Sequence, residues 1–235
     1  MGEAGMSDWR LFADRPALET ALATEVATRL TQGIAQRGKG YLVVSGGSTP
    51  LQLFSLLSQT EIDWGKVVVL LADERWVDAQ HDDSNERMVR TTLLTNRAAA
   101  ADFISLVGEL DSADGNVSSV SQALQDMPRF DVVILGMGED AHTASLFPCS
   151  EEIAEGLKTD QGALITRPTT APHQRISLSR QRLQNTEFGV VHIVGETKRS
   201  VAEQAARCGD EVVYPISAFI GDNTGAAGFD LWWAP

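Results

Sequence analysis

Short apolar runs recur along this chain, and they constrain its fold more than any other feature. The clearest are residues 41–44, 67–71 and 131–135, which consist largely of Val, Leu and Ile. A strand that alternates apolar and polar residues has one face in water, whereas a strand that is apolar throughout is covered on both faces. Because helical patterns separate these runs, we predict a mainly parallel sheet with helices on each side, in a three-layer, doubly wound α/β fold.

The other elements are predicted from spacing and from helix-ending residues. Apolar residues four apart predict a long helix over residues 16–37, with Gly38 just past its end. We also expect helices over residues 50–57, 84–94, 117–126 and 196–207, and strands over residues 103–107, 175–178, 188–194 and 231–233. No repeat, low-complexity tract or linker divides the sequence, so we expect a single domain over residues 1–235.

The charge balance limits the partners of the chain. Its 32 acidic and 19 basic residues give a formal net charge of −13, which argues against nucleic acid because phosphate backbones require a clustered cationic face. An anionic substrate would need the few basic residues gathered in one pocket. Cys149 and Cys208 lack the spacing of a zinc site or a disulfide framework. With no apolar run of about 18 residues and no secretory signal at the N-terminus, we expect a cytoplasmic protein that spans no membrane. Because the sequence gives little sign of an exposed apolar patch, we expect a monomer.

A Gly-rich turn follows the first apolar run. Residues 45–50 read Ser-Gly-Gly-Ser-Thr-Pro, and we expect Thr49 to cap the next helix and Pro50 to open it. Such a turn bares backbone N–H groups at the positive end of a helix dipole, which favours phosphate binding. The candidate phosphate-binding residues are Gly46, Gly47, Ser48 and Thr49. The alternative is an ordinary strand-to-helix turn that binds no ligand. The turn is not a P-loop, because the lysine of that motif is absent.

Three charged residues, Asp73, Glu74 and Arg75, come directly after the second apolar run. A solvated loop would explain them, but they stand where α/β sheets bind ligands, at the carboxyl end of a strand. An arginine there can bind an anion or stabilise developing negative charge. Ser84 and Asn85 follow at the start of a predicted helix; a cap by Ser84 accounts for the pair, and Asn85 is a candidate substrate contact.

The third apolar run ends in a turn that contains Asp140 and His142. Residues 136–141 match the dinucleotide-binding pattern GxGxxA, but Pro148 stops any helix within about two turns, so that match is weak. A neutral imidazole is a suitable general base for water, and a nearby carboxylate can fix its tautomer. The turn therefore predicts a base, His142, oriented by Asp140, with a structural loop histidine as the alternative.

Two isolated cations complete the set of candidate residues. Arg175 begins a strand after Pro172, and Lys198 lies in the first turn of a helix. A positive charge at a helix N-terminus opposes the helix dipole, so its position there favours an anionic partner over a simply solvated side chain.

These motifs together resemble the 6-phosphogluconolactonases. The matching segments are SGGSTP at 45–50, LADERWV at 71–77, DSN at 83–85, GMGEDAHTASLFP at 136–148, RISLS at 175–179 and GETKR at 195–199. They occur in the family's order, and the resemblance covers nearly the whole chain. The family is similar in fold to the glucosamine-6-phosphate deaminases. Those deaminases carry an aromatic-Asn-Glu-Pro run after the histidine, where this chain has Thr-Ala-Ser-Leu-Phe-Pro.

The resemblance implies hydrolysis of 6-phospho-D-glucono-1,5-lactone to 6-phosphogluconate, without metal or cofactor. His142 would activate water, and Arg75 with loop N–H groups would stabilise the oxyanion. The phosphate would bind to the Gly-rich turn between Arg175 and Lys198, with Asp73 lining the site. The family usually has Gly where this chain has Ala141; if that position needs a positive φ, Ala costs roughly 1 kcal/mol.

Three other functions remain open at this point. The first is an amino-sugar-phosphate isomerase or deaminase, against which the missing Asn-Glu-Pro run speaks. The second is a sugar-phosphate-binding regulator, which would have no use for a base such as His142 beside a carbonyl carbon. The third is a dinucleotide-dependent oxidoreductase, which rests only on the weak glycine pattern.

Overall fold

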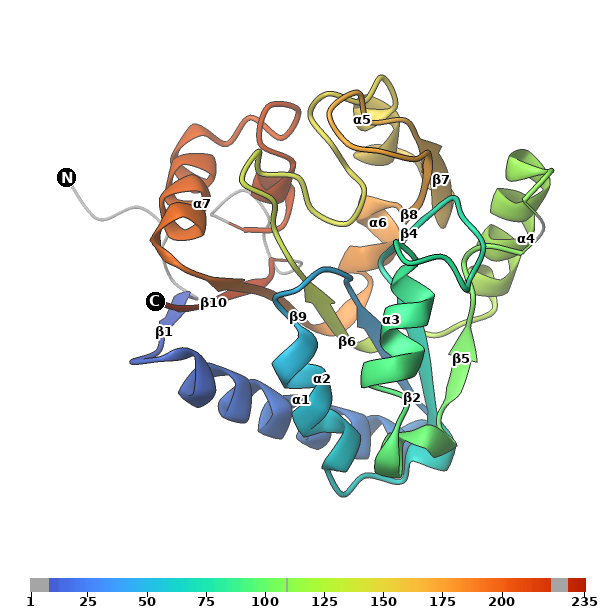
Figure 1. Ribbon diagram of the computed structural model, residues 1–235, viewed down its shortest axis with the longest axis vertical. Helices are drawn as coiled ribbons and strands as arrows, with labels where there is room; N and C mark the ends of the chain where they lie inside the picture. Colours follow the sequence, from blue (N-terminus) through green and yellow to red (C-terminus); the bar gives the residue numbers. More distant parts are fainter. Residues whose placement is uncertain (1–8, 109, 221–227) are drawn as a thin grey trace.

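A seven-stranded parallel sheet forms the centre of the computed structural model, which describes residues 9–108, 110–220 and 228–235 (Figure 1). The strand order is β1-β10-β9-β6-β2-β3-β5, and every neighbouring pair runs parallel. The strands are β1 (Trp9–Leu11), β2 (Gly40–Val44), β3 (Val67–Leu71), β5 (Asp102–Ile104), β6 (Phe130–Leu135), β9 (Thr186–Val194) and β10 (Asp230–Ala234). Every residue of β3 and β6 is buried, which confirms the parallel sheet expected from their apolar sequences.

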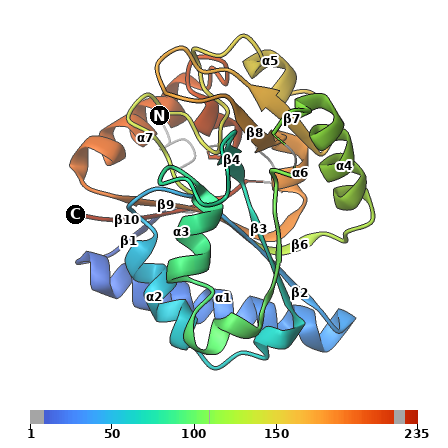
Figure 2. The ribbon, with the colours of Figure 1, turned by 45° about the vertical axis from the view of Figure 1, so that its right-hand side comes forward.

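Helices cover both faces of this sheet. α1 (Arg15–Arg37), α2 (Leu51–Gln59) and α3 (Asn85–Thr92) lie on one side (Figures 1 and 2). The other side carries α4 (Ala113–Gln125), α5 (Ile153–Gly156) and α7 (Glu196–Cys208). The remaining short helix is α6 (Arg180–Gln184), and 3₁₀ turns lie at Trp64–Lys66, Asn96–Ala100 and Pro215–Ala218. The three-layer α/β architecture predicted from the sequence is confirmed. None of the helices described here is long and apolar enough to cross a membrane.

A second, smaller sheet was not predicted. Its order is β4-β8-β7, formed by β4 (Asp73–Arg75), β8 (Arg175–Leu178) and β7 (Ala163–Thr166), and both pairings are antiparallel. Residues 73–75, expected as charged residues after a strand, instead form a strand themselves. Three consecutive charged residues lack the apolar pattern from which a strand is predicted. The segment is extended because it pairs with β8. The pairing places Arg75 directly opposite Arg175.

Two helix starts were predicted differently from what the structure shows. Thr49 does not cap α2, because the helix begins at Leu51 with Pro50 in the cap position and no side-chain cap bond. α4 begins at Ala113, four residues before the expected start. Ser84, in contrast, caps α3 as predicted, since its hydroxyl accepts from the backbone N–H of Arg87 at 3.1 Å.

β5 is shorter than predicted, because it ends at Ile104 rather than at Val107. The hydroxyl of Ser105 donates to the carbonyl of Val107 at 2.8 Å and accepts from the N–H of the same residue at 3.3 Å. This local side-chain bonding replaces the strand ladder and turns the chain, although residues 105–107 are apolar enough to suggest a longer strand.

Candidate active site

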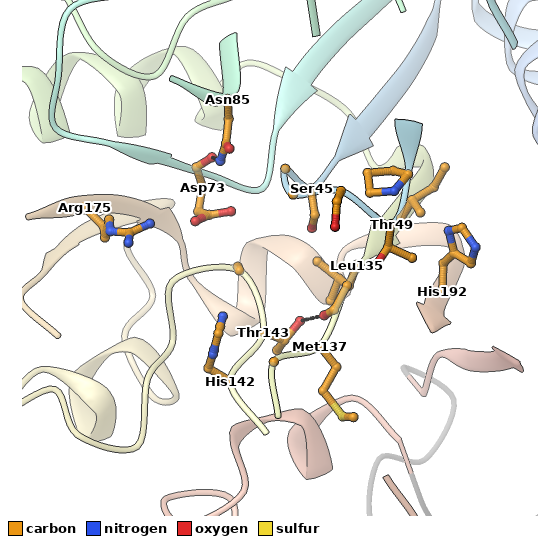
Figure 3. A pocket seen from close by; sticks show the side chains of 18 of the residues that line it. Ser45, Thr49, Asp73, Asn85, Leu135, Met137, His142, Thr143, Arg175 and His192 are labelled. Atoms are coloured by element: carbon orange, nitrogen blue, oxygen red, sulfur yellow. Dashed lines mark hydrogen bonds between the residues drawn. The ribbon is translucent and has the colours of Figure 1, made fainter. Parts of the chain in front are cut away.

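A cavity of about 280 Å³ opens at the carboxyl ends of β2 and β6, near the centre of the main sheet (Figure 3). Its wall includes ten of the eleven residues predicted as site residues, and the eleventh, Asp140, contacts the His142 side chain without lining the wall. The ten are Gly46, Gly47, Ser48, Thr49, Asp73, Arg75, Asn85, His142, Arg175 and Lys198. The sequence thus identified a set of residues that the fold brings together, from segments up to 152 positions apart (198 − 46).

The Gly-rich turn has a backbone conformation and a close packing that require glycine at two positions. Gly47 has φ of +91°, which is accessible to glycine at no steric cost. A Cβ atom on Gly46 would collide with the side chain of Asn85. From below, the guanidinium of Arg15 on α1 donates to the carbonyl of Thr49 at 2.8 Å. The turn is therefore held on two sides, with its hydroxyls and N–H groups at the cavity.

Glu74 anchors the segment that carries Asn85. Its carboxylate accepts from three backbone N–H groups, those of Arg75 at 2.7 Å, Asn85 at 2.8 Å and Glu86 at 2.6 Å, and from the hydroxyl of Ser84 at 3.0 Å. Burial raises the pKa of Glu74, and these hydrogen bonds counteract part of that rise. A carboxylate at the start of α3 also interacts favourably with the helix dipole.

Asp73 is buried at the back of the cavity and held from two directions. Its Oδ2 accepts from the hydroxyl of Ser145 at 2.5 Å, and its carbonyl accepts from the side-chain amide of Asn85 at 3.0 Å. The backbone N–H of Ser145 donates in turn to the hydroxyl of Ser177 at 3.2 Å. Ser145 was not predicted as a site residue, because a serine within an apolar loop segment gives no sign of the carboxylate that it meets 72 positions away.

Arg75 and Arg175 stand opposite each other on β4 and β8. Directly opposed residues of an antiparallel pair share a face, and like charges in that arrangement are destabilising. Backbone carbonyls hold both guanidiniums: Arg75 donates to Asp83, and Arg175 donates to Pro172 at 2.9 Å and to His173 at 3.3 Å. Burial lowers the pKa of Arg175, and the Arg75 charge lowers it further while Asp73 raises it. Two adjacent cations at a cavity wall can together bind an anion.

His142 has the geometry of an oriented base. Its Nδ1 lies 2.5 Å from Oδ1 of Asp140, whose carboxylate also accepts from the backbone N–H of His142 at 3.2 Å. Burial alone would raise the pKa of Asp140, but the hydrogen bond and the charge of His142 outweigh it and the pKa is lowered. An ionised Asp140 accepts a hydrogen bond from the N–H at Nδ1, and in the neutral imidazole Nε2 then carries the lone pair. The ring stacks on Phe147 with centroids 4.0 Å apart.

The turn around His142 is unusual in its backbone. Ala141 adopts φ of +66°, and its N–H donates to the carbonyl of Gly138 at 3.1 Å. A Cβ atom on Gly138 would collide with the ring of His142 and the carboxylate of Asp140. Residues 136–152, all of them described in the structure, contain no helix, so the weak dinucleotide pattern of residues 136–141 lacks the helix N-terminus that binds a pyrophosphate.

His192 is a cavity residue that the sequence prediction missed. It lies on β9 and is 2% exposed, and its Nε2 has no hydrogen-bond partner in the described structure. Burial lowers its pKa to about 4, with smaller effects from the charges of Arg15 and Lys198, so the imidazole is neutral near pH 7. The available signal was a single polar residue within the apolar run 188–194.

The cavity has two differently equipped sides. His142 and Arg175 lie on one side, and Thr49 and His192 lie on the other (Figure 3). Lys198, in the first turn of α7, is half-buried; burial lowers its pKa and the charge of Glu139 raises it. Together the two sides offer an oriented base, a Gly-rich turn and three cations, which suits an anionic substrate with an electrophilic centre.

The chain matches the family model described as glucosamine-6-phosphate isomerases/6-phosphogluconolactonase over residues 13–227. It is 38% identical to a 6-phosphogluconolactonase of Pseudomonas putida, over 95% of this chain and 91% of that protein. It is 40% identical to a 6-phosphogluconolactonase of Mesorhizobium japonicum, over 97% of this chain and 95% of that protein. A crystal structure of a 6-phosphogluconolactonase from Shewanella baltica superimposes with a TM-score of 0.93 at 44% identity, covering 99% and 98% of the two chains. On the fold, the site and these likenesses, the chain belongs to the glucosamine-6-phosphate isomerase/6-phosphogluconolactonase family.

Proposed function

We propose that this protein hydrolyses 6-phospho-D-glucono-1,5-lactone to 6-phospho-D-gluconate. The observation that carries the proposal is the 2.5 Å contact with Asp140 made by His142, which lines the same cavity as a Gly-rich turn and three cations. The named activity of relatives at 38–40% identity supports it. We further propose the following roles for the cavity residues.

The phosphate binds at the Gly-rich turn. Backbone N–H groups of residues 46–49 and the hydroxyls of Ser48 and Thr49 donate to its oxygens. Lys198, whose charge acts on His192, contributes a positive charge to the cavity, and Arg175 provides a second cation from the side opposite Thr49 (Figure 3). The charges of these two residues favour a phosphorylated lactone over a neutral one.

His142 activates the attacking water. With Nδ1 bound to Asp140, Nε2 accepts the water proton as the oxygen attacks the lactone carbonyl. The imidazolium that forms is stabilised by the Asp140 carboxylate. The carbonyl oxygen becomes an oxyanion, and the guanidinium of Arg75 is the candidate donor to it.

Collapse of the tetrahedral intermediate breaks the bond to the ring oxygen. The imidazolium of His142 returns its proton to that oxygen, which gives the hydroxyl of the open-chain acid. A lactone is an activated ester, so a general base, which typically contributes about 10²–10⁴-fold, is sufficient without a covalent nucleophile.

The test compares wild type with His142→Gln in a lactone-hydrolysis assay, with the lactone generated in situ and the spontaneous rate subtracted. We expect kcat to fall by about 10²–10⁴-fold while 6-phosphogluconate still binds. Full activity in the variant would contradict His142 as the base. A wild type without lactonase activity that releases ammonia from glucosamine 6-phosphate would instead favour the deaminase.

A further inference from the structure

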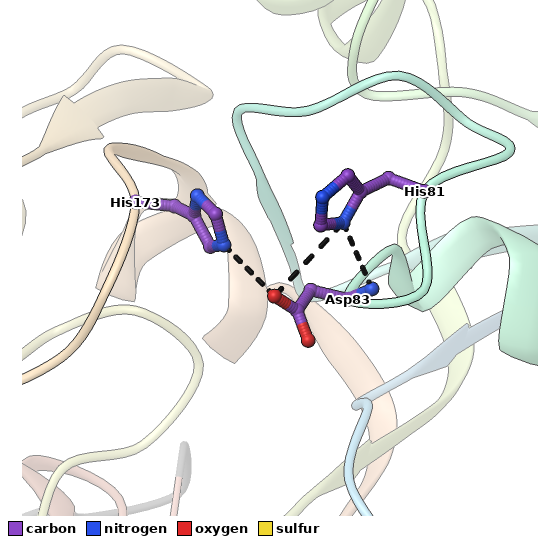
Figure 4. A group of neighbouring side chains, drawn as sticks. All are labelled: His81, Asp83 and His173. Carbon is purple, nitrogen blue, oxygen red and sulfur yellow. Dashed lines mark hydrogen bonds and ion pairs between the residues drawn. The ribbon is translucent and has the colours of Figure 1, made fainter.

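A second group of histidine and carboxylate side chains lies outside the cavity. His81 and Asp83 belong to the loop between β4 and α3, and His173 belongs to the segment that leads into β8 (Figure 4). The two segments are 90 positions apart in sequence, and the Asp83 side chain bridges them. The cavity wall contains none of these three residues, and the reaction proposed above does not use them.

The three side chains converge on a small volume. Oδ2 of Asp83 lies 2.9 Å from Nε2 of His173 and 3.9 Å from Nδ1 of His81, and one ligand atom from each residue falls within 4.8 Å of the others. For comparison, nitrogen and oxygen ligands about 2.0–2.1 Å from a tetrahedral Zn²⁺ ion stand roughly 3.3 Å apart. The observed separations lie on both sides of that value, so small side-chain rotations would suffice.

One imidazole already presents a lone pair, and the other, His173, would release the Nε2 proton that it donates to Asp83 when a metal ion binds. The backbone N–H of Asp83 donates to Nδ1 of His81 at 3.1 Å, so this nitrogen presents a lone pair, as a metal ligand must. A metal ion would replace that long hydrogen bond with a coordinate bond. The side chains of His81 and Asp83 are about half exposed, which leaves room for water in the remaining coordination positions.

We propose that His81, Asp83 and His173 form a binding site for a divalent transition-metal ion, with Zn²⁺ as the best-matched probe. Two imidazoles and one carboxylate are a ligand set that Zn²⁺ and its first-row neighbours prefer, whereas Mg²⁺ and Ca²⁺ prefer oxygen ligands alone. The site is separate from the hydrolytic centre and supplies no step of the reaction proposed above.

The bound ion would brace the rim of the cavity. The carbonyl of Asp83 accepts from Arg75, and the carbonyl of His173 accepts from Arg175. A metal ion coordinated by these same two residues would fix the segments that hold both guanidiniums. Asp83 and His173 would each bind the ion through the side chain, and each holds an arginine through its backbone carbonyl. Metal binding would therefore also order the arginine pair.

The experiment is a calorimetric titration of the metal-free full chain with Zn²⁺. We expect one ion per chain in the wild type and affinity at least about tenfold weaker in Asp83→Asn and in His173→Gln, because each removes a direct ligand. Asp82→Asn is the matched control, since it removes an adjacent exposed carboxylate, and His142→Gln removes the other histidine–carboxylate pair. Both controls should bind Zn²⁺ as the wild type does.

Thermal unfolding provides a second readout that does not depend on activity. At a Zn²⁺ concentration about 100 times the dissociation constant, Tm of the wild type should rise by about 5–10 °C, and Tm of Asp83→Asn should not. Unchanged binding in both ligand variants, or binding that is lost only in His142→Gln, would overturn the proposal. Absence of binding to the wild type would overturn it as well.

Discussion

Ala141 stands at a backbone position that ordinarily favours glycine, and it is completely buried. A left-handed conformation costs an L-residue about 1–2 kcal/mol, which glycine would avoid. A glycine would bury one methyl group less, which costs about 0.8 kcal/mol of stability. It would also make the unfolded chain more flexible, which costs about another 0.4–1 kcal/mol. The opposing effects nearly cancel, so the alanine is tolerated in the turn that presents His142.

We therefore expect Ala141→Gly to change the free energy of unfolding by less than about 1 kcal/mol. Ala141→Val should destabilise by at least about 2 kcal/mol, because a β-branched side chain fits neither the positive φ nor the filled space. Denaturant unfolding of the three proteins measures both differences. A loss of several kcal/mol in the glycine variant would show that the positive φ is not strained in the native protein.

Lys198 is the residue that best separates phosphate binding from chemistry. Lys198→Met keeps most of the apolar stem and removes the charge. KM for the phosphorylated lactone should rise about 10- to 100-fold, the worth of one charge-assisted hydrogen bond, with little change in kcat. KM for unphosphorylated gluconolactone should stay unchanged. The exposed Lys158→Met is the charge-matched control, and an equal effect on both substrates would remove Lys198 from the phosphate site.

At the scale of elements, β9 places a neutral histidine in the sheet interior. His192 has a pKa of about 4 in the folded protein against an ordinary value of 6.5, because burial disfavours its charged form. Above pH 6.5 it is neutral in both states and has no effect on stability. Between pH 6.5 and about 4 the unfolded chain binds a proton that the folded chain does not. The free energy of unfolding therefore decreases as the pH is lowered through this interval.

The lowering of the His192 pKa from 6.5 to about 4 corresponds to a loss of about 3 kcal/mol in the free energy of unfolding by pH 4. His192→Leu should lose less stability than the wild type over this interval, by about that amount. Urea unfolding at several pH values measures the two profiles. Parallel profiles between pH 6.5 and pH 4 would mean that His192 is accessible to protons in the folded state.

The elements also differ in how far the sequence could predict them. β3 and β6 were predicted well, because a strand buried on both faces must be apolar throughout. β4 could not be predicted, since its extended form depends on pairing with β8, roughly 100 positions later in the chain. Most of the predicted cavity residues were predictable because they follow the end of an apolar run, at the edge where α/β sheets bind ligands. His192, within a strand, carried no such positional signal.

At the scale of the whole molecule, the formal charge of −13 makes the cavity electrostatically distinct. An anionic sugar phosphate is repelled by the protein as a whole, while Arg75, Arg175 and Lys198 attract it at the rim and wall. The long-range repulsion is screened by salt within about 10 Å at 0.1 M ionic strength, and the contacts inside the cavity are screened much less. The short-range attraction therefore favours the binding of an anion at the cavity.

The opposed arginines of the smaller sheet set a limit on how this protein can be made more robust. Arg75 and Arg175 repel each other across β4 and β8 when the cavity holds no anion. Replacing either by an uncharged residue would relieve that repulsion and remove a cation to which the proposed reaction assigns a role. Selection for thermal robustness and selection for turnover therefore act in opposite directions at these two positions, and a library screened for stability alone would tend to discard the arginines.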